Sequence, residues 1–385
     1  MRCCTRHNLA LTRPILPSLL RIPVSAQVPI PIVLVGCGAV AQQFYLPTLR
    51  TLSSLGEVSV QSLVDPSDSA REVMAAMFPQ AQQATHLGES NAAEGSLAII
   101  ATPPRFHCAQ TLESVKRGWH VLCEKPMAST SAECEQMIAA ARDSGRLLAV
   151  GLYKRFFASS RYLKDLFSQG QLGALRSFNI AEGGPFRWPA ASPSFFNKAQ
   201  TPGGVLLDIG VHVLDLLIWW LAEPSAYQYS DDAMGGLETN ARVELSYPTG
   251  ARGMIHLSRD WNTSNHYRFV FERGIVGWKV NDANGLTLQL AGVSSALRSQ
   301  LVTPSTASMT DPPARVQPTN PQSFIAQLRN VVAAIQGREP LLIPGEEGLR
   351  SLRFIETCYA HRTLIEQPWF TAAEAERARQ LAATP

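Results

Sequence analysis

The sequence has few charged residues, and its cysteines show none of the spacings typical of zinc sites. Charged residues make up 17% of the 385 positions and hydrophobic residues 45%, a balance that excludes a disordered chain and predicts a compact fold. The seven cysteines include no Cys-x-x-Cys, and none lies at a zinc-binding interval from a histidine, so we expect no metal site. Free cysteines in apolar segments are typical of a reducing compartment, which predicts a cytoplasmic location.

The sequence also lacks a membrane span and a basic surface for nucleic acid. The best apolar candidate, residues 205–222, is interrupted by Asp208, His212 and Asp215, whereas a span needs about 18 or more apolar residues. The formal net charge is +3, but residues 1–30 hold four arginines and no acid, so the rest of the chain sums to −1 (3 − 4). We therefore expect neither a membrane nor a nucleic acid as a partner.

Residues 1–28 are expected to lie outside the folded domains. They contain no acid and three prolines, somewhat like a targeting peptide, but arginines and prolines interrupt the apolar core that a secretion signal needs. We expect a flexible extension or a start codon assigned too far upstream, with a targeting segment as the alternative.

Residues 29–151 alternate short apolar runs with helix-like segments. The strand-like runs are 30–35, 58–64, 97–101, 120–123 and 147–150. Continuous apolar runs separated by helices of about 10–15 residues are typical of a parallel sheet covered on both faces. We therefore predict an α/β chain whose first domain is of the dinucleotide-binding type.

After residue 152 the pattern changes to consecutive strands. The strand-like runs are 174–181, 226–230, 239–247, 251–258, 266–272 and 274–280. Turn signals at Pro248-Thr-Gly250 and Glu272-Arg-Gly274 join neighbouring runs as hairpins. Residues 152–370 are therefore predicted to form an α+β domain with an open, mainly antiparallel sheet. Within this domain we expect a Pro-, Ser- and Thr-rich surface loop at 300–322 and closing helices at about 323–366. Residues 371–385 are expected to form a tail outside it.

A glycine-rich turn connects the first strand to the first helix. Val33-Leu-Val-Gly36-Cys-Gly38-Ala-Val-Ala41 fits Gly-x-Gly-x-x-Ala, in which Gly36 permits a tight turn and Gly38 lets a pyrophosphate approach the backbone at the helix N-terminus. No Gly-Lys-Ser/Thr follows, which excludes a P-loop. We expect a dinucleotide to be bound at Gly36, Gly38, Ala39 and Val40.

The following strand ends carry further candidates for cofactor contacts. Asp65 ends the second strand, where a carboxylate accepts hydrogen bonds from ribose hydroxyls and repels a 2′-phosphate. This favours NAD over NADP, although Arg71 in the next helix would weaken the preference. The next two strand ends face the same edge of the sheet, and we expect cofactor contacts there from Thr102, Pro103, His107, Glu124 and Lys125.

Candidate acid–base side chains lie at 125 and on a helix near 205–222. Asp208, His212 and Asp215 are spaced i, i+4 and i+7, so they share one helix face. Without the other motifs, we would interpret His212 as a buried structural histidine. Lys125 would likewise be interpreted as an ion-pair partner of Glu124 or as a surface lysine. Beside a nicotinamide, Lys125 is suited to hydrogen-bond a substrate oxygen and to stabilise an alkoxide.

In this order the motifs resemble the glucose–fructose oxidoreductase, inositol dehydrogenase and rhizopine-catabolism (Gfo/Idh/MocA) family. The resemblance covers about residues 29–370. It rests on Gly36-Cys-Gly38, Ala101-Thr-Pro-Pro104, Glu124-Lys125-Pro126, Tyr153-Lys-Arg155-Phe156, Gly203-Gly204 through His212, Pro344-Gly-Glu-Glu-Gly-Leu-Arg350 and Ile355-Glu-Thr-Cys-Tyr359.

The resemblance implies a Rossmann domain, NAD or NADP as cofactor and hydride transfer at a sugar-type hydroxyl. It also implies that the open sheet forms an oligomer interface, and hence a homodimer or homotetramer. Lys125, Asp208 and His212 match the residues that line the reacting carbon. Some relatives have Tyr where this chain has His212, so the arrangement is nearer to that of inositol dehydrogenase.

We therefore expect an NAD(P)-dependent oxidoreductase acting on a sugar, a polyol or a sugar derivative, with Lys125 and His212 as an acid–base pair. Asp208, or else Asp215, is expected to orient His212, and either Lys125 or His212 is the formal base. Predicted substrate contacts are Arg155, Arg187, Trp188, Asp208, His212 and Trp261, with binding of a carboxylate or phosphate as the alternative for Arg187. The alternative functions are a glycosidase that uses tightly held NAD for transient oxidation and a non-catalytic NAD- or sugar-sensing regulator.

Overall fold

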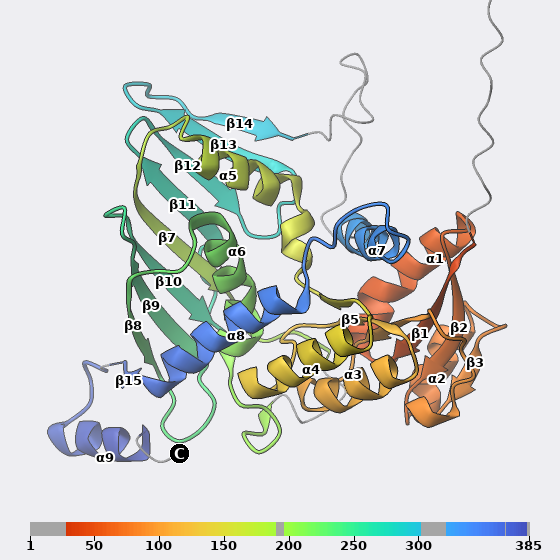
Figure 1. The fold of residues 1–385 in the computed structure, drawn as a ribbon. Coiled ribbons are helices and arrows are strands. Elements are labelled where there is room, and N and C mark those ends of the chain that lie inside the picture. Colours follow the sequence, from red (N-terminus) through yellow and green to blue (C-terminus); the bar gives the residue numbers. More distant parts are fainter. Residues whose placement is uncertain (1–27, 190–195, 302–320, 366, 383–385) are drawn as a thin grey trace, which may run out of the picture.

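The computed structural model describes residues 28–189, 196–301, 321–365 and 367–382, which form two domains side by side (Figure 1). One domain is built around a parallel sheet and the other around a larger mixed sheet. Two helices run along the junction, α7 (Pro321–Ile335) and α8 (Gly345–Ala360). Helix α7 packs on α1 (Leu46–Ser54), and α8 packs on both α4 (Ser131–Asp143) and α6 (Val211–Leu221), so the junction is closed by helices from the end of the chain.

The first domain holds a six-stranded parallel sheet in the order β3-β2-β1-β4-β5-β6. Its strands are β1 (Ile30–Val35), β2 (Val58–Val64), β3 (Gln82–Ala84), β4 (Leu97–Ile100), β5 (His120–Cys123) and β6 (Leu148–Val150). Successive side chains of a strand point to opposite faces, so β1 serves two cores. Ile32 and Leu34 pack with the core that α1 and α7 complete, whereas Val33 and Val35 belong to the core that continues into the second domain. The predicted parallel sheet is confirmed; the short strand β3 was not predicted.

Local signals explain where the helices of this domain begin. Helix α4 starts with a capping box, in which the Thr130 hydroxyl accepts the Glu133 N–H and the Glu133 carboxylate accepts the Thr130 N–H, both at 3.2 Å. The Ser67 hydroxyl caps α2 (Asp68–Ala75) by accepting the Ala70 N–H. The same domain contains α1, the short π-helical segment η1 (Ala41–Tyr45) directly before it, α3 (His107–Lys116), and the 3-10 helices η2 (Leu87–Glu89) and η3 (Pro104–Phe106).

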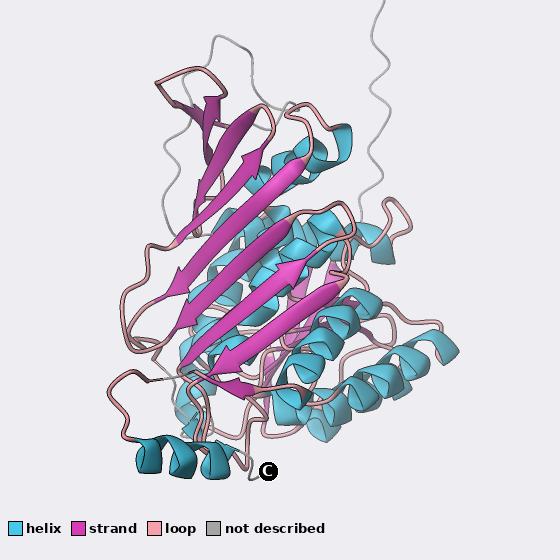
Figure 2. Cartoon of the chain, turned by 90° about the vertical axis from the view of Figure 1, so that its left-hand side faces the viewer, coloured by secondary structure: helices cyan, strands magenta, loops and turns pink. Residues whose placement is uncertain are grey.

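The second domain holds a nine-stranded sheet in the order β14-β13-β12-β11-β7-β10-β9-β8-β15. Its strands are β7 (Leu175–Gly183), β8 (Ala226–Asp231), β9 (Asn240–Ser246), β10 (Arg252–Ser258), β11 (His266–Phe271), β12 (Gly274–Lys279), β13 (Gly285–Leu290), β14 (Leu297–Gln300) and β15 (Thr363–Leu364). All neighbours pair antiparallel except β7 with β10 and β8 with β15. Helices α5 (Ala158–Gln169) and α6 lie on one face, and Figure 2 shows no helix over the other face within the described ranges. The predicted open, mainly antiparallel sheet is confirmed.

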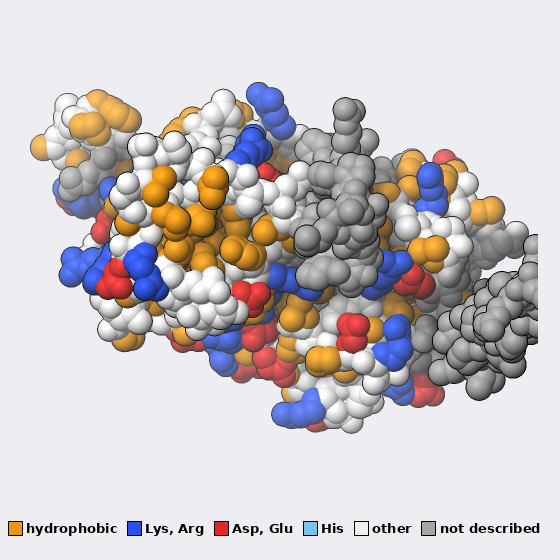
Figure 3. Space-filling view, turned by 90° about the horizontal axis from the view of Figure 1, so that it is seen from above, with side chains coloured by type: hydrophobic (Ala, Val, Ile, Leu, Met, Phe, Trp, Pro, Cys, Tyr) orange, Lys and Arg blue, Asp and Glu red, His pale blue; other side chains and the backbone are white. Residues whose placement is uncertain are grey.

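The structure differs from the sequence expectations mainly near the C-terminus. Strands β13 and β14, which extend the sheet, were not predicted. Their alternation of apolar and polar residues is too weak to distinguish them from a loop. Apolar side chains gather over this end of the sheet in Figure 3, and Leu290, Val293 and Leu297 are exposed there. Helix α8 ends at Ala360 rather than near 366, and α9 (Ala372–Ala382) lies where we expected a tail. Most of the expected loop at 300–322, and residues 1–27, lie outside the described residues.

None of the helices in the described ranges combines the length and the apolar character needed to cross a bilayer. The five cysteines described are all buried free thiols. Within the same residues, no three His, Cys, Asp or Glu side chains are grouped so as to hold a metal ion.

Candidate active site

The glycine-rich turn has the geometry that a bound pyrophosphate requires. Gly36 has φ +91°, and a Cβ there would lie 2.8 Å from the Ala101 carbonyl, so the end of β4 approaches too closely for any other residue. A Cβ on Gly38 would meet no atom within 4 Å, which leaves open space at the helix start. The first N–H groups of a helix have no intrahelical partner, so this space faces unpaired donors. Gly36, Gly38, Ala39 and Val40 thus form a cradle that fits a dinucleotide.

Asp65 binds the backbone of this turn. Its carboxylate accepts the Cys37 N–H at 2.8 Å and the Ser67 N–H at 2.8 Å. Arg71 donates to the Asp65 carbonyl and pairs with Asp68, so its guanidinium already has anionic and carbonyl partners. The negative charge of Asp65 therefore lies beside the turn, with the cation of Arg71 held by Asp68.

His107 and Glu124 support the neighbouring strand ends from inside. His107 is 0% exposed, and its ring nitrogens lie 2.7 Å from the Thr102 carbonyl and 3.0 Å from the Pro126 carbonyl. The expected cofactor contact by the His107 side chain is therefore wrong for this structure, because the ring links the two turns instead. Glu124 is buried, accepts the Tyr45 hydroxyl at 2.7 Å and accepts the Lys125 N–H at 3.2 Å. Burial raises the pKa of Glu124.

Lys125 and Asp208 form the centre of the site. The Lys125 amine donates to the Asp208 carboxylate at 3.0 Å and to the Asp208 carbonyl at 2.9 Å. The other oxygen of the same carboxylate pairs with Arg259. Burial lowers the pKa of Lys125 from 10.5 to about 8; the charge of Arg259 acts in the same direction, and the charges of Glu124 and Glu182 oppose it. An amine with this pKa is suited to exchange protons near neutral pH.

His212 lies on the same helix as Asp208 but does not pair with it. The residue is 7% exposed, and its buried Nδ1 has no hydrogen-bond partner among the described residues. Its ring packs edge-on against Tyr153, with 5.2 Å between centroids. Burial lowers the pKa of His212 well below its usual value, and the charges of Lys125 and Lys154 act in the same direction, so the imidazole is neutral.

The expectation that Asp208 or Asp215 orients His212 is therefore wrong for this structure. Asp208 lies in a π-helical segment (η6, Leu206–Gly210) that leads into α6, and its carboxylate binds the two cations Lys125 and Arg259. A carboxylate gains more from two cations than from a neutral imidazole, which is the physical reason for this choice of partners. Asp215 accepts two hydrogen bonds from Arg155, at 2.9 and 2.6 Å.

Arg155 is a structural residue and does not reach the substrate region. Its side chain is 2% exposed and also donates to Glu347 of α8 at 2.6 Å. The predicted substrate contact by Arg155 is therefore wrong. The guanidinium instead joins η4 (Tyr153–Phe156), α6 and α8 behind the site, and two carboxylates compensate its buried charge.

The other predicted substrate residues lie on loops. Trp188 stacks on Phe44 of η1, with 6.0 Å between ring centroids and 8° between the planes, so this loop reaches the helix that follows the dinucleotide turn. Arg187 is exposed. Trp261 is 52% exposed and donates from its indole to Asn240 at 2.7 Å.

Sequence reasoning missed three charged side chains near the site, those of Lys154, Glu182 and Arg259. The Lys154 amine donates to Glu182 at 2.6 Å, and the Tyr267 hydroxyl donates to the other Glu182 oxygen at 2.7 Å, all in the interior. Lys154 belongs to the motif Tyr153-Lys-Arg155-Phe156, so its place in the sequence was a usable signal. Arg259 directly follows β10 and no sequence motif marks it.

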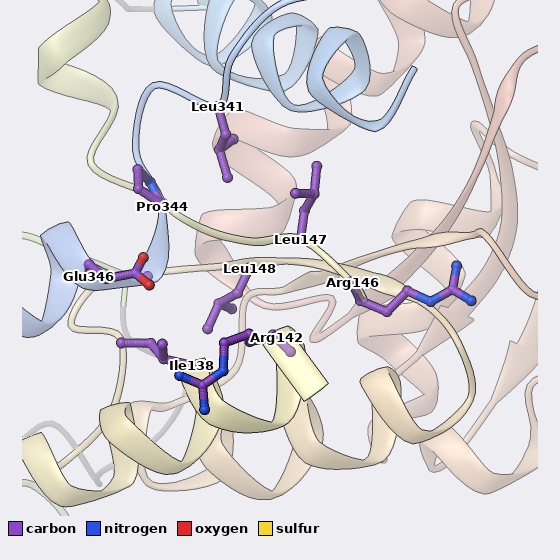
Figure 4. Close-up of a pocket in the computed structure, with 10 residues that line it drawn as sticks. Ile138, Arg142, Arg146, Leu147, Leu148, Leu341, Pro344 and Glu346 are labelled. Carbon is purple, nitrogen blue, oxygen red and sulfur yellow. The ribbon is translucent and has the colours of Figure 1, made fainter. Parts of the chain in front are cut away.

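A pocket of about 160 Å³ lies elsewhere, between α4, β6 and the start of α8 (Figure 4). Ile138, Leu148 and Pro344 line it together with Arg142. Neither the residues of the glycine-rich turn nor Lys125, Asp208 and His212 border this pocket, so it lies apart from the candidate active site.

Comparison with protein-family models agrees with this geometry. Residues 30–152 match the model of the oxidoreductase family with an NAD-binding Rossmann fold, and residues 160–276 match the Gfo/Idh/MocA C-terminal domain. The chain belongs to the Gfo/Idh/MocA family. The resemblance inferred from the motifs is thereby confirmed, including the order of the two domains.

Two dehydrogenases are similar to this chain in sequence. D-Glucoside 3-dehydrogenase of Escherichia coli (strain K12) is 30% identical over 210 residues, which are 51% of this chain and 55% of that protein. The NADP(+)-dependent scyllo-inositol 2-dehydrogenase of Bacillus subtilis (strain 168) is 26% identical over 264 residues, 68% of this chain and 66% of that protein. The matches thus span between about half and two thirds of these relatives.

Two solved structures have a fold similar to that of this chain. The aldose–aldose oxidoreductase of Caulobacter crescentus superposes with a TM-score of 0.71 at 24% identity, covering 86% of this chain and 97% of that one. The WlbA dehydrogenase of Bordetella pertussis, solved with NADH and UDP-GlcNAcA, gives 0.68 at 20% identity, covering 86% and 96%. At these identities the likeness shows the fold.

Proposed function

We propose that this protein transfers hydride between a nicotinamide dinucleotide and a hydroxyl or carbonyl carbon of a sugar, a polyol or a sugar derivative. The observation that carries the proposal is the pairing of the Lys125 amine with Asp208, at the end of β5 and in the same cluster of side chains as a neutral His212. The similar proteins named above are dehydrogenases of glucosides and inositols, which supports this substrate class.

The dinucleotide would be held by the Gly36–Val40 cradle, with Asp65 beside it. When bound, the nicotinamide supplies or accepts the hydride. The fit of the cradle supports this, because Gly38 leaves open space where a pyrophosphate binds in such turns. Asp65 supports NAD over NADP, since a carboxylate repels a 2′-phosphate and Asp68 already neutralises Arg71.

Lys125 and His212 act on the substrate oxygen as a pair. In oxidation, the neutral Lys125 amine accepts the hydroxyl proton, because its pKa of about 8 lets it exchange protons near neutral pH, whereas the pKa of His212 is lowered well below its usual value. His212 stays neutral and hydrogen-bonds the same oxygen, which orients the carbon that loses hydride. In reduction, the Lys125 ammonium donates the proton back and stabilises the developing oxyanion.

The assembly and location follow as proposals of the same kind. The face of the nine-stranded sheet that no helix of the described residues covers supports pairing of copies into a homodimer or homotetramer. The buried, unpaired thiols support a cytoplasmic location.

The test is a turnover assay on a panel of polyols, sugars and sugar acids with NAD or NADP, in which formation of the reduced cofactor is followed by absorbance. We expect Lys125→Met and His212→Gln each to lower kcat by roughly 10²-fold or more while NADH still binds. Lys116→Met, at an exposed lysine of α3, is the matched control and should leave kcat unchanged. Full activity in both site variants would refute the assigned roles. A free sugar released without net NADH would favour the glycosidase instead.

A further inference from the structure

Arg259 is held in one place by the backbone around it. It directly follows β10, where its N–H donates to the Thr239 carbonyl at 2.8 Å and its carbonyl accepts the Phe186 N–H at 2.9 Å. Its guanidinium lies 5.4 Å from the centroid of the Phe186 ring. The side chain is therefore directed from a fixed strand end, past an aromatic ring, to the carboxylate of Asp208.

The Asp208 carboxylate is consequently shared by two cations. One oxygen binds the Lys125 amine at 3.0 Å and the other pairs with Arg259, with all three side chains largely buried. Among the described residues, the Lys125 amine donates to two acceptors, and both belong to Asp208: its carboxylate and its carbonyl. The orientation of the Lys125 amine thus depends on the position of Asp208. Arg259 pairs with the second carboxylate oxygen of Asp208 and so helps to fix that position.

We propose that Arg259 is a positioning residue for proton exchange: it fixes Asp208 against Lys125 and takes a share of the Asp208 charge, so that the Lys125 amine stays aimed at the substrate oxygen and able to lose its proton. This inference rests on the proposed function of Lys125. It extends that function because neither the motifs nor the match to the Gfo/Idh/MocA family marks Arg259.

The charges around Lys125 determine whether removal of Arg259 should raise or lower the pKa of Lys125. The titratable and charged groups that face it from the packed elements are Glu124, Lys154, Glu182, Asp208, His212 and Arg259. Burial lowers the pKa of Lys125, and Arg259 lowers it further. Without the guanidinium, Asp208 would neutralise Lys125 alone and one repelling charge would be lost. Both changes favour the ammonium, so the pKa of Lys125 should rise.

The first experiment measures kcat for oxidation against pH in the full-length protein. In Arg259→Met we expect the midpoint of the profile to move to higher pH by about one unit, with a fall in kcat near pH 7. Arg259→Lys, which keeps a charge, should restore most of the shift. Arg377→Met, at an exposed arginine of α9, is the control and should leave the midpoint unchanged. An equal loss of kcat at every pH with an unmoved midpoint would show a merely structural role and overturn the proposal.

A second measurement separates this proposal from the function on which it rests. The chain has six lysines, so protein labelled with ¹³C at lysine Cε gives few signals, and Lys125→Met identifies the one from Lys125. We expect the Lys125 signal to titrate near pH 8 in the substrate-free protein and at higher pH in Arg259→Met. If this shift occurs in a protein that turns over no substrate, Arg259 positions Lys125 and the hydride-transfer proposal fails. If turnover is found and the signal does not move, the role of Arg259 is wrong. Should Arg259→Met not fold, the same titration in Arg259→Gln and Arg259→Lys decides between these outcomes.

Discussion

The Tyr359 hydroxyl donates to a carboxylate oxygen of Glu238 at 2.7 Å, and the same oxygen accepts the N–H groups of Gly204 and Leu206, each at 3.0 Å. Glu238 thus satisfies the free donors at the start of the helical segment that carries Asp208 and His212. This contact also explains the glycine at 203. A Cβ there would lie 2.1 Å from the Tyr359 hydroxyl, so the paired glycines of the motif make room for the Glu238–Tyr359 contact.

Removal of this contact should destabilise the protein and disturb the site. Tyr359→Phe is expected to cost about 1.5–3 kcal/mol, the usual range for a hydrogen bond to a charged group, and Glu238→Ala more, because several buried donors lose their acceptor. Urea unfolding measures the loss. Tyr227→Phe is the matched control, since its hydroxyl bonds His361 at 2.8 Å in an exposed place and should cost little. Equal losses for Tyr227→Phe and Tyr359→Phe would contradict this account.

The rate of oxidation should depend on the protonation of Lys125. Only the neutral amine accepts a proton, and burial lowers the pKa of Lys125 to about 8. We therefore expect kcat/KM for oxidation to rise with pH through about 8 and then level off, and the reverse reaction to decline over the same range. Initial rates from pH 6 to pH 10 in both directions provide the measurement. Two flat profiles would exclude Lys125 as the group that exchanges the proton.

Arg155 should matter for stability rather than for substrate affinity. Arg155→Met leaves the buried Asp215 without its two hydrogen bonds, and removal of one partner from a buried pair costs roughly 3–5 kcal/mol. The double variant Arg155→Met/Asp215→Leu should recover part of this loss, because no unpaired charge remains at 215. Urea unfolding tests both. A large rise in KM with unchanged stability would restore Arg155 as a substrate residue.

Cofactor preference should depend on Asp65. We expect NADH to bind more tightly than NADPH by about tenfold or more, through like-charge repulsion at the 2′-phosphate. Asp65→Asn should narrow the gap, since the amide oxygen still accepts the Cys37 N–H while the charge is gone. Fluorescence titration of both cofactors supplies the dissociation constants, and Glu72→Gln, at an exposed acid of α2, is the control. Tighter binding of NADPH to the unaltered protein would refute the preference.

Much of the fold could be predicted from the sequence because its signals are local. The apolar runs of β1 and β4 are continuous and short, which distinguishes strands buried on both faces, and the Gly36–Gly38 turn needs conformations that only glycine adopts readily. The helix spacing placed Asp208 and His212 in one segment. β13 and β14 were not predicted because most of their side chains are partly or fully exposed and their sequences carry little periodic signal.

The partners of the charged side chains were decided only by the tertiary structure. Lys125 and Asp208 are 83 positions apart, and Arg259 lies 51 positions beyond Asp208 (259 − 208), so no local pattern links them. The sequence by itself determined the family, its nucleotide-binding turn and the candidate site residues Lys125, Asp208 and His212. The packing of β5, η6 and β10 brings Asp208 next to Lys125 and Arg259. Asp208 therefore forms ion pairs with these two cations, because ion pairs form between charges that the fold brings close together, and His212 stays neutral.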